Sequence, residues 1–128
     1  MAEIVALVEA WLERPNFIAF VILLLWGIYI MVAHPNFVKK LIGLYIVQTS
    51  VIFFLVAFST KTGATVPILL PGEGAVEAER YTNPLPHVLT LTAIVVQVAT
   101  LGVSLALVSA IYRKYGSLDE DEVLKRLE

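Results

Sequence analysis

The chain has 128 residues, of which 59% are hydrophobic and 16% are charged, and its formal net charge is −2. A soluble domain normally carries about 25% charged residues, so this composition points to a membrane protein. The sequence contains no cysteine, which excludes disulfides, thiolate metal sites and thiol catalysis. The slightly negative charge argues against a nucleic-acid partner, because such proteins present a basic surface.

Residues 1–14 predict a short amphipathic helix. A cleavable signal peptide would begin with a positively charged segment, whereas Glu3, Glu9 and Glu13 stand here. Between these acids, apolar residues recur at helical spacing, namely Ile4, Val5, Val8, Trp11 and Leu12. We expect this helix to lie in the membrane interface and to end near Pro15. The alternative is an extension of the first spanning helix, with a kink at Pro15.

Three apolar runs follow, at residues 17–33, 41–58 and 88–111. Crossing the hydrocarbon core takes roughly 20 apolar residues, with a range of about 17 to 25, so each run is long enough. The helices of a soluble bundle would each show a charged outer face, and none of these runs does. The sequence therefore predicts an all-α integral membrane protein with three transmembrane helices in a single membrane domain.

The connections between the runs differ in length and composition. Residues 34–40 form a tight connection, which makes the first two helices an antiparallel hairpin. Residues 59–87 are rich in Pro and Gly and include several acids, Glu73 among them, so we expect an extramembrane loop that is mostly irregular. The alternating charges of residues 115–128 predict a short solvated helix in a cytoplasmic tail.

Basic residues near the ends of the runs indicate the orientation, because cytoplasmic segments carry the excess of Lys and Arg. One side of the membrane would carry Lys39, Lys40, Arg113 and Lys114, with Lys125 and Arg126 in the tail. The other side would carry Arg14, Lys61 and Arg80. We therefore expect the N-terminus outside and the C-terminus in the cytoplasm.

Small and polar residues form stripes on the second and third helices at about 100° per residue. On the third helix, one stripe contains Thr90, Ala93, Gln97, Thr100 and Ser104, and the opposite stripe contains Ala99, Gly102, Ala106 and Ser109. On the second helix, Gly43, Ser50 and Ala57 form one seam, and Tyr45, Gln48 and Ser59 lie on the other side. Helices associate in lipid through small residues and interhelical hydrogen bonds. Three helices cannot bury all these faces, so we expect a subunit that packs against other membrane subunits.

No Asp, Glu, Lys, Arg or His lies within the three runs, although proton transporters usually place such residues in the membrane. Gln97 is the strongly polar residue of the third run, and an unpaired buried amide is costly. It either forms an interhelical hydrogen bond or lines a hydrated path, and Gln48 allows the same two interpretations. We find no nucleotide loop, catalytic triad or metal cluster in the sequence, and expect no cofactor, no metal and no catalysis by this chain.

A stretch at the start of the third helix carries a family resemblance. Residues 83–96, NPLPHVLTLTAIVV, resemble the DPLPQALILTAIVI signature of the C subunit of Mrp-type multisubunit cation/proton antiporters. The Mrp C subunit belongs to the same family as the K subunit of respiratory complex I. Residues 27–29 and 39–44 resemble the family's hairpin between helices one and two. The match runs from about Phe17 to Tyr115, and its signature turn contains Asn83, Pro84, Pro86 and His87.

The resemblance implies a small scaffold subunit beside large antiporter-like subunits in the plasma membrane of a prokaryote, with Na+ and H+ as ions at subunit interfaces. The family also has counterparts in archaeal membrane-bound hydrogenase and sulfur-reductase complexes. Two departures from complex I K subunits matter, because their two membrane glutamates align with Tyr45 and Gln97. A relay of protons between glutamates therefore cannot be carried over, and the Mrp-like branch is favoured. Asn83 replaces the Asp that often begins the signature.

Three functional hypotheses follow. The leading one is a non-catalytic subunit of an Mrp-type sodium/proton antiporter module, free-standing or within a hydrogenase-like respiratory complex, in which Gln97, Thr100 and Ser104 line or support a hydrated path. The second is a purely structural subunit that touches no ion. The third is an autonomous small transporter, which the lack of a carboxylate in the membrane disfavours.

Overall fold

The computed structural model describes residues 1–61, 63–72, 74–75 and 77–128, so Glu73 of the long loop lies outside the described residues. Its elements in chain order are α1 (Ala2–Leu12), α2 (Pro15–Ala33), α3 (Phe37–Ser59), the 3-10 helix η1 (Ala78–Arg80), α4 (Leu85–Tyr115) and α5 (Glu120–Leu127). Within the described ranges, extended pairing is limited to two isolated bridges. The helices α2, α3 and α4 are long and apolar enough to cross a membrane. The prediction of an all-α chain with three transmembrane helices is confirmed.

Local chemistry explains where the spanning helices begin and end. Pro15 stands in the first turn of α2, where a missing backbone N–H costs nothing. The Asn36 side chain accepts from the backbone N–H of Val38 at 2.9 Å and caps α3. The helix α4 ends where Gly116 takes φ +69°, a left-handed conformation that suits glycine.

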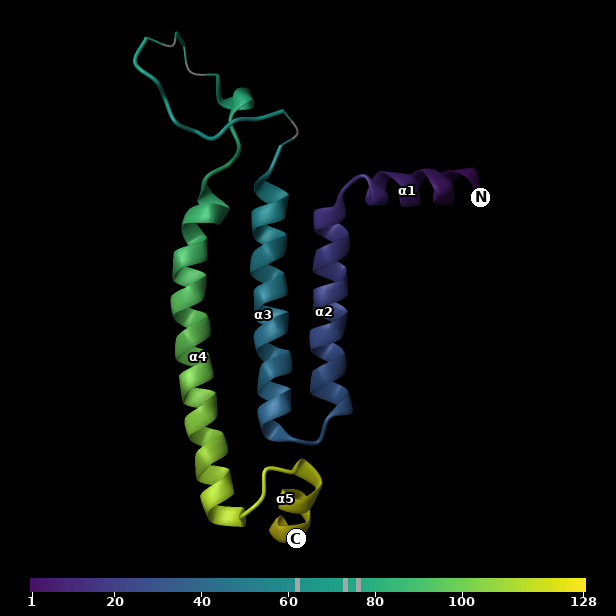
Figure 1. Ribbon diagram of the computed structural model, residues 1–128, viewed down its shortest axis with the longest axis vertical. Helices are drawn as coiled ribbons and strands as arrows, with labels where there is room; N and C mark the ends of the chain where they lie inside the picture. Colours follow the sequence, from purple (N-terminus) through teal and green to yellow (C-terminus); the bar gives the residue numbers. More distant parts are fainter. Residues whose placement is uncertain (62, 73, 76) are drawn as a thin grey trace.

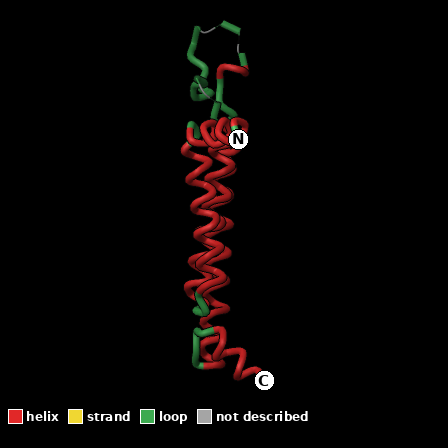
Figure 2. Tube along the Cα trace, turned by 90° about the vertical axis from the view of Figure 1, so that its right-hand side faces the viewer, coloured by secondary structure: helices red, strands yellow, loops and turns green. Residues whose placement is uncertain are grey.

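The three spanning helices lie in one flat layer with α3 in the middle. Figure 1 shows α2 and α4 on opposite sides of α3, and the turned view in Figure 2 shows the three helices overlapping edge-on. Packing between elements is accordingly extensive for α2 with α3 and present for α3 with α4. Both broad faces of the layer remain uncovered, so only 6% to 17% of the most apolar segments is buried.

The α2–α3 interface is a close approach of two backbones. A methyl group placed on Gly43 would lie 2.8 Å from the carbonyl oxygen of Gly27 and 3.0 Å from the backbone nitrogen of Met31. A methyl group on Gly27 would lie 2.9 Å from the carbonyl oxygen of Gly43. Further along α3, Ser50 and Ala57 are also buried. The seam of Gly43, Ser50 and Ala57 thus faces α2, and small residues permit this contact.

Replacing Gly43 with Ala should destabilise the α2–α3 hairpin by about 1 to 3 kcal/mol, because the added methyl group meets backbone atoms that cannot move aside independently. Gly102→Ala is the matched control, since no atom lies within 4 Å of a methyl group there. Both variants gain the same helix propensity, so the difference in thermal unfolding midpoint of the full chain in one detergent isolates the contact. Equal midpoints would contradict the close-packing account.

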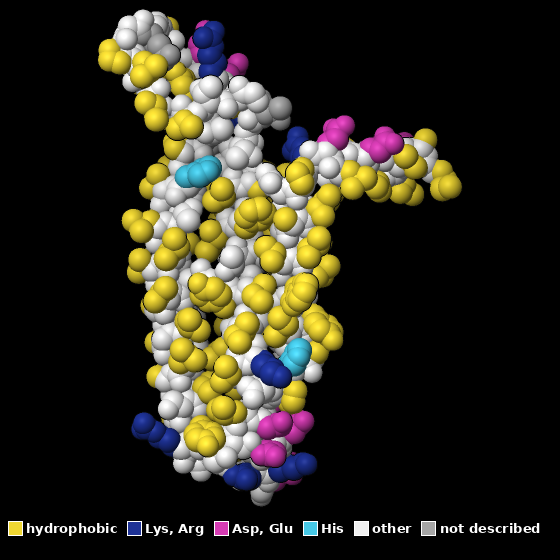
Figure 3. Space-filling model, in the orientation of Figure 1, with side chains coloured by type: hydrophobic (Ala, Val, Ile, Leu, Met, Phe, Trp, Pro, Cys, Tyr) yellow, Lys and Arg dark blue, Asp and Glu magenta, His cyan; other side chains and the backbone are white. Residues whose placement is uncertain are grey.

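At the N-terminal end, α1 is a separate helix set across the layer. Figure 1 shows α1 nearly at right angles to α2, at the level where α2 begins. In Figure 3 the acidic side chains of α1 lie on its upper side and the hydrophobic ones on its lower side, the direction in which the spanning helices run. The break at Glu13 and Arg14 rules out a continuous extension of α2. The predicted short N-terminal helix is therefore confirmed, and its amphipathic orientation suits a membrane surface.

At the opposite end, the tail turns back onto the α2–α3 connection. The backbone N–H of Phe37 donates to the Leu118 carbonyl at 2.9 Å, and that of Glu120 donates to the Pro35 carbonyl at 2.8 Å. Val123 of α5 is 6% exposed. The short tail helix expected from the sequence is present as α5, and one side of it packs on the hairpin.

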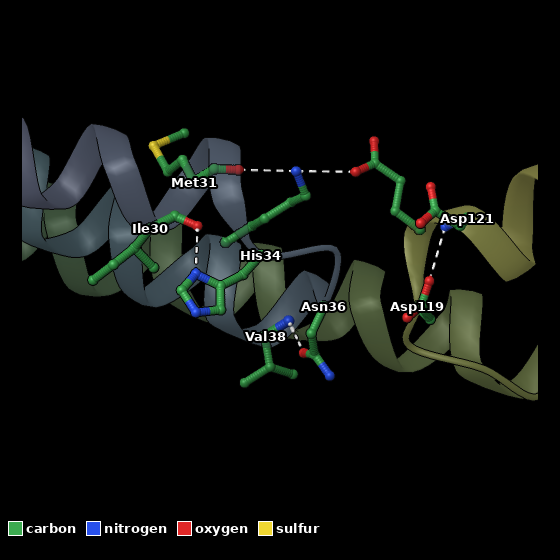
Figure 4. A network of polar contacts seen from close by, with 9 residues as sticks. Ile30, Met31, His34, Asn36, Val38, Asp119 and Asp121 are labelled. Carbon is green, nitrogen blue, oxygen red and sulfur yellow. Dashed lines mark hydrogen bonds and ion pairs between the residues drawn. The ribbon is translucent and has the colours of Figure 1, made fainter.

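Lys40 of α3 contacts both α2 and α5 at this end of the layer. Figure 4 shows the polar network there, with Met31 and Asn36 labelled. The Lys40 ammonium group donates to the Met31 carbonyl at 2.9 Å and lies 2.9 Å from a carboxylate oxygen of Glu120. Met31 lies in the last turn of α2, where backbone carbonyls lack partners within the helix. Lys40 thus satisfies one such carbonyl and pairs α3 with the first residue of α5.

We predict that Val123→Asp releases the tail, because the variant would place a charge in a buried contact. Trypsin cleavage at Lys125 and Arg126 of the full chain should then be at least about tenfold faster. Glu120→Gln should accelerate cleavage by less than about fivefold, because a partly exposed ion pair contributes about 0 to 1 kcal/mol. Faster cleavage of Glu120→Gln than of Val123→Asp would show that the ion pair, rather than the apolar contact, holds α5.

Candidate functional site

A buried amide links α4 to α3 near the middle of the layer. Gln97 is 7% exposed, and its side-chain nitrogen donates to the Thr49 hydroxyl at 2.9 Å and to the Tyr45 carbonyl at 3.3 Å. The Thr49 hydroxyl donates in turn to the same Tyr45 carbonyl at 2.9 Å. Because a carbonyl oxygen only accepts, the nitrogen of Gln97 must face Tyr45. The three groups therefore form a closed network between two transmembrane helices.

The network leaves one side of the Gln97 amide uncommitted. Its carbonyl oxygen accepts no hydrogen bond from the described residues. Among these residues no fully buried side-chain oxygen or nitrogen lacks a partner, so this oxygen is at the surface of the chain. An amide oxygen is a good acceptor from water and a suitable ligand for a hard cation. Gln97 therefore holds the helices together through its nitrogen and has an oxygen available for another group.

A small, mostly apolar cavity lies along the same interface. Its volume is about 10 Å³, close to the lower limit for a single water molecule. The polar residues that line it are Tyr45, Gln48, Thr100 and Ser104. The Thr100 hydroxyl donates to the Val96 carbonyl at 2.8 Å, and the Ser104 hydroxyl donates to the Thr100 carbonyl at 2.7 Å. Both hydroxyls are committed as donors to their own helix, so toward the cavity they can act as acceptors.

Within the part of the chain that the structure describes, Gln48 and Tyr45 do not form the interhelical side-chain hydrogen bonds that would be one way for them to act at the α3–α4 interface. The Gln48 amide lines the cavity but has no hydrogen-bond partner among the described residues. Tyr45 enters the network through its backbone carbonyl, and the residue as a whole is 40% exposed. The five residues singled out from the sequence do lie along one interface. Direct contact across the helices rests on Gln97, Thr49 and the Tyr45 backbone.

A second polar contact closes the other end of the α3–α4 pair. Ser59 is 5% exposed, and its hydroxyl donates to the Val56 carbonyl at 2.7 Å. The Ser59 oxygen also lies 3.3 Å from Nδ1 of His87. Because the serine proton is already used, the histidine donates from Nδ1 in this pair. His87 is thereby tied to α3.

The signature turn forms the start of α4. The Asn83 side chain accepts from the backbone N–H of Leu85 at 3.1 Å, while Pro84 occupies the cap position and Pro86 the first turn. Proline has no backbone N–H to leave unpaired there. An Asp at position 83 would offer the same acceptor, so the amide here preserves the turn while removing its charge.

Sequence reasoning missed Thr49 and the Ser59–His87 pair. Thr49 lies in the Gln-Thr-Ser interruption of the second run, one turn after Tyr45 and on the side that faces α4. Because Thr49 lies on the same side of the helix as Tyr45, helical periodicity alone could have placed it at the interface with α4. On the far side of α4, the stripe of Ala99, Gly102, Ala106 and Ser109 is exposed, so one of its two predicted packing faces is covered by α3 and the other is open. Searched over the described residues, the structure holds no cluster of His, Cys, Asp or Glu suited to a metal.

A family model described as NADH-ubiquinone/plastoquinone oxidoreductase chain 4L matches residues 15–126. The chain therefore belongs to this family. The resemblance inferred from the signature, to the family of complex I K subunits and Mrp C subunits, is confirmed. Together with the three apolar helices, this membership makes the chain a multi-pass membrane protein.

Two relatives and one solved structure resemble the chain over most of its length. An uncharacterized protein of Methanocaldococcus jannaschii is 36% identical over 114 residues, which cover 88% of each chain. A protein of Rhizobium meliloti, named as the probable C subunit of a K(+)/H(+) antiporter, is 33% identical over 84 residues, covering 66% of this chain and 71% of the relative. A chain in the membrane-bound sulfane sulfur reductase, an archaeal respiratory membrane complex, matches with a TM-score of 0.72 and 36% identity, covering 84% of this chain and 94% of that chain.

A double-mutant cycle tests the bond between Gln97 and Thr49. We expect Gln97→Leu and Thr49→Val to couple by about 0.6 kcal/mol and at most about 1.7 kcal/mol, as for interhelical hydrogen bonds in a membrane. Unfolding free energies of the full chain in one detergent would supply the four values. Thr92→Val on the exposed side of α4 serves as the control partner and should not couple with Gln97→Leu. Absence of coupling with Thr49→Val would contradict the network.

Proposed function

We propose that this chain is a small, non-catalytic membrane subunit of a cation/proton antiporter module, either free-standing or within a respiratory membrane complex. The observation that carries the proposal is the arrangement of α4, which has a buried amide network on one side and an open face of small residues on the other. Such a helix connects its own chain to a neighbour. A flat layer of three helices, with both broad faces uncovered, does not enclose a transport path by itself.

The family and the relatives support this class. One relative is named as a subunit of a K(+)/H(+) antiporter, and the similar solved chain is part of a respiratory membrane complex. The expectation of a small membrane subunit of an Mrp-type antiporter or respiratory complex is confirmed at the level of class. The resemblance found in the sequence implies Na+ as the cation, whereas one relative is named for K+. Transport assays with each cation would decide which one the module moves.

In this role, the α3–α4 interface supports a hydrated path and does not carry protons itself. The residues at the two aligned glutamate positions are Tyr45 and Gln97, and neither side chain is a carboxylate that could carry a proton. The free oxygen of Gln97 and the hydroxyl oxygens of Thr100 and Ser104 are acceptors that can hold water or approach a cation. Proton-carrying groups then belong to the neighbouring subunits.

The open face of α4 is the surface that we assign to a partner membrane subunit. Gly102 and the residues of its stripe let a second helix approach closely, as α2 approaches Gly43. We further propose the plasma membrane of a prokaryote, with the N-terminus outside and the C-terminus in the cytoplasm. The support is that the end with α5 carries more Lys and Arg than the end with α1.

A purely structural role is the second candidate, and two observations favour it. The donor side of Gln97 is fully used within the chain, and the adjoining cavity is close to the limit for one water molecule. A packed interface of this kind needs no ion to explain its polar residues.

Gln97→Leu separates the two roles, because it replaces the amide with an apolar side chain that is one atom shorter. If the chain supports a hydrated path, cation/proton exchange in membrane vesicles should fall at least about tenfold while the subunit still copurifies with its partners. Exchange and copurification that both remain unchanged would overturn the ion-path role. Loss of copurification alone would favour the structural role.

Gly102→Leu tests the partner face independently. No atom of the chain lies within 4 Å of a Cβ at this position, and Leu favours a helix more than Gly does, so the isolated subunit should unfold at the same or a slightly higher temperature. Copurification of other membrane subunits through a tag on this chain should fall at least about tenfold, because a bulky side chain blocks close helix approach. Leu91→Val, on another exposed part of α4, should leave copurification intact. Normal assembly of the Gly102→Leu variant would place the partner elsewhere.

A further inference from the structure

The bend between α1 and α2 encloses a hollow that the proposed function does not use. Its volume is about 540 Å³, which is within the range of ligand pockets. From the bend it is lined by Glu13, Arg14 and Phe17, and from the end of α3 by Phe58, Thr60 and Lys61. Two segments that are far apart in the sequence thus form one concave surface at the end of the layer that carries α1.

The charges of this hollow favour a single negative charge. Arg14 and Lys61 supply two positive charges and Glu13 supplies one negative charge, leaving a net charge of +1. Neither cation forms an ion pair within the described part of the chain. The Arg14 guanidinium lies 6.0 Å from the centre of the Phe17 ring, and no side chain caps the N-terminus of α2. The positive end of that helix dipole adds to the same potential.

Below the charged rim the walls are aromatic. The ring of Phe58 lies 6.0 Å from that of Phe54, and the ring of Phe17 also lies 6.0 Å from Phe54. A neighbouring hollow of about 320 Å³ is lined by Trp11, Arg14 and Phe17 among others. Arg14 and Phe17 line both hollows, so a charged region and an apolar region meet at this point.

We propose that this pair of hollows binds a membrane phospholipid, with its phosphate between Arg14 and Lys61 and an acyl chain along Phe17 and Phe58. The phosphodiester of such a lipid carries one negative charge, which matches the net charge of the rim. A free phosphate would make no use of the aromatic walls, whereas a lipid contacts both regions. The site lies where a spanning helix meets an amphipathic surface helix, the level at which lipid phosphates and aromatic side chains gather. The proposal rests on the membrane topology alone and is independent of transport.

Native mass spectrometry of the full chain, extracted in a mild detergent together with its partners, tests the site. The probe is phosphatidylglycerol of one defined chain length, and inorganic phosphate is the comparison. We expect one bound lipid in the wild type and no competition by equimolar phosphate. Arg14→Gln and Lys61→Gln should each reduce lipid retention about tenfold, since each removes a charged hydrogen bond to the phosphate. Lys39→Gln at the other end of the layer should change nothing.

The charge-conserving pair Arg14→Lys with Lys61→Arg guards against a folding defect. It should retain the lipid if phosphate recognition is the role of these residues. If the double variant Arg14→Gln with Lys61→Gln fails to assemble, the two single variants and the charge-conserving pair still decide the question. Equal lipid retention in the wild type and both single variants would overturn the proposal. Displacement of the lipid by inorganic phosphate at equal concentration would also overturn it.

Discussion

The middle position of α3 is the constraint on which the rest of the structure depends. A helix in the middle of a flat layer must satisfy a neighbour on each side, and its two sides therefore need different residues. Toward α2 it presents Gly43, Ser50 and Ala57, which bring backbones together. Toward α4 it presents the Tyr45 carbonyl, Thr49 and Ser59, which meet polar groups of α4. One 23-residue helix thus defines both interfaces of the layer.

The two interfaces are held by different kinds of contact. Backbone contact at Gly27 and Gly43 gains dispersion and excludes lipid, and it admits no foreign atom because even a methyl group collides there. The α3–α4 interface relies on a few hydrogen bonds, each modest in a membrane, and leaves a small cavity. The α2–α3 contact is therefore made by backbone atoms, while the α3–α4 contact is made by polar side chains. The two kinds of contact lie on opposite sides of one helix.

Much of the fold could be predicted from the sequence because length and hydropathy determine which segments cross a membrane. The seam of Gly43, Ser50 and Ala57 and the stripe around Gln97 followed from helical periodicity, and both lie at helix interfaces in the structure. Helical periodicity shows which residues share a face, but it does not show which residues of a neighbouring helix they contact. Thr49 went unrecognised because its role depends on the axial register between α3 and α4, which a single sequence does not specify. The docking of α5 was also missed, since its backbone contacts with Pro35 and Phe37 leave no pattern in side chains. The roles of Gln48, Thr100 and Ser104 in transport stay predictions.

The return of α5 to the hairpin turn makes the two ends of the layer mechanically unequal. At that end, backbone bonds and Lys40 join the segment after α4 to the connection between α2 and α3, so the chain closes on itself. At the other end, α3 and α4 are joined by a long loop and by the contact of Ser59 with His87. The end with α5 is thus held by backbone bonds and an ion pair, and the opposite end by one side-chain contact of 3.3 Å. A force that a neighbouring subunit exerts on α4 would therefore separate α3 from α4 first at the end with His87, where the fewest bonds oppose it.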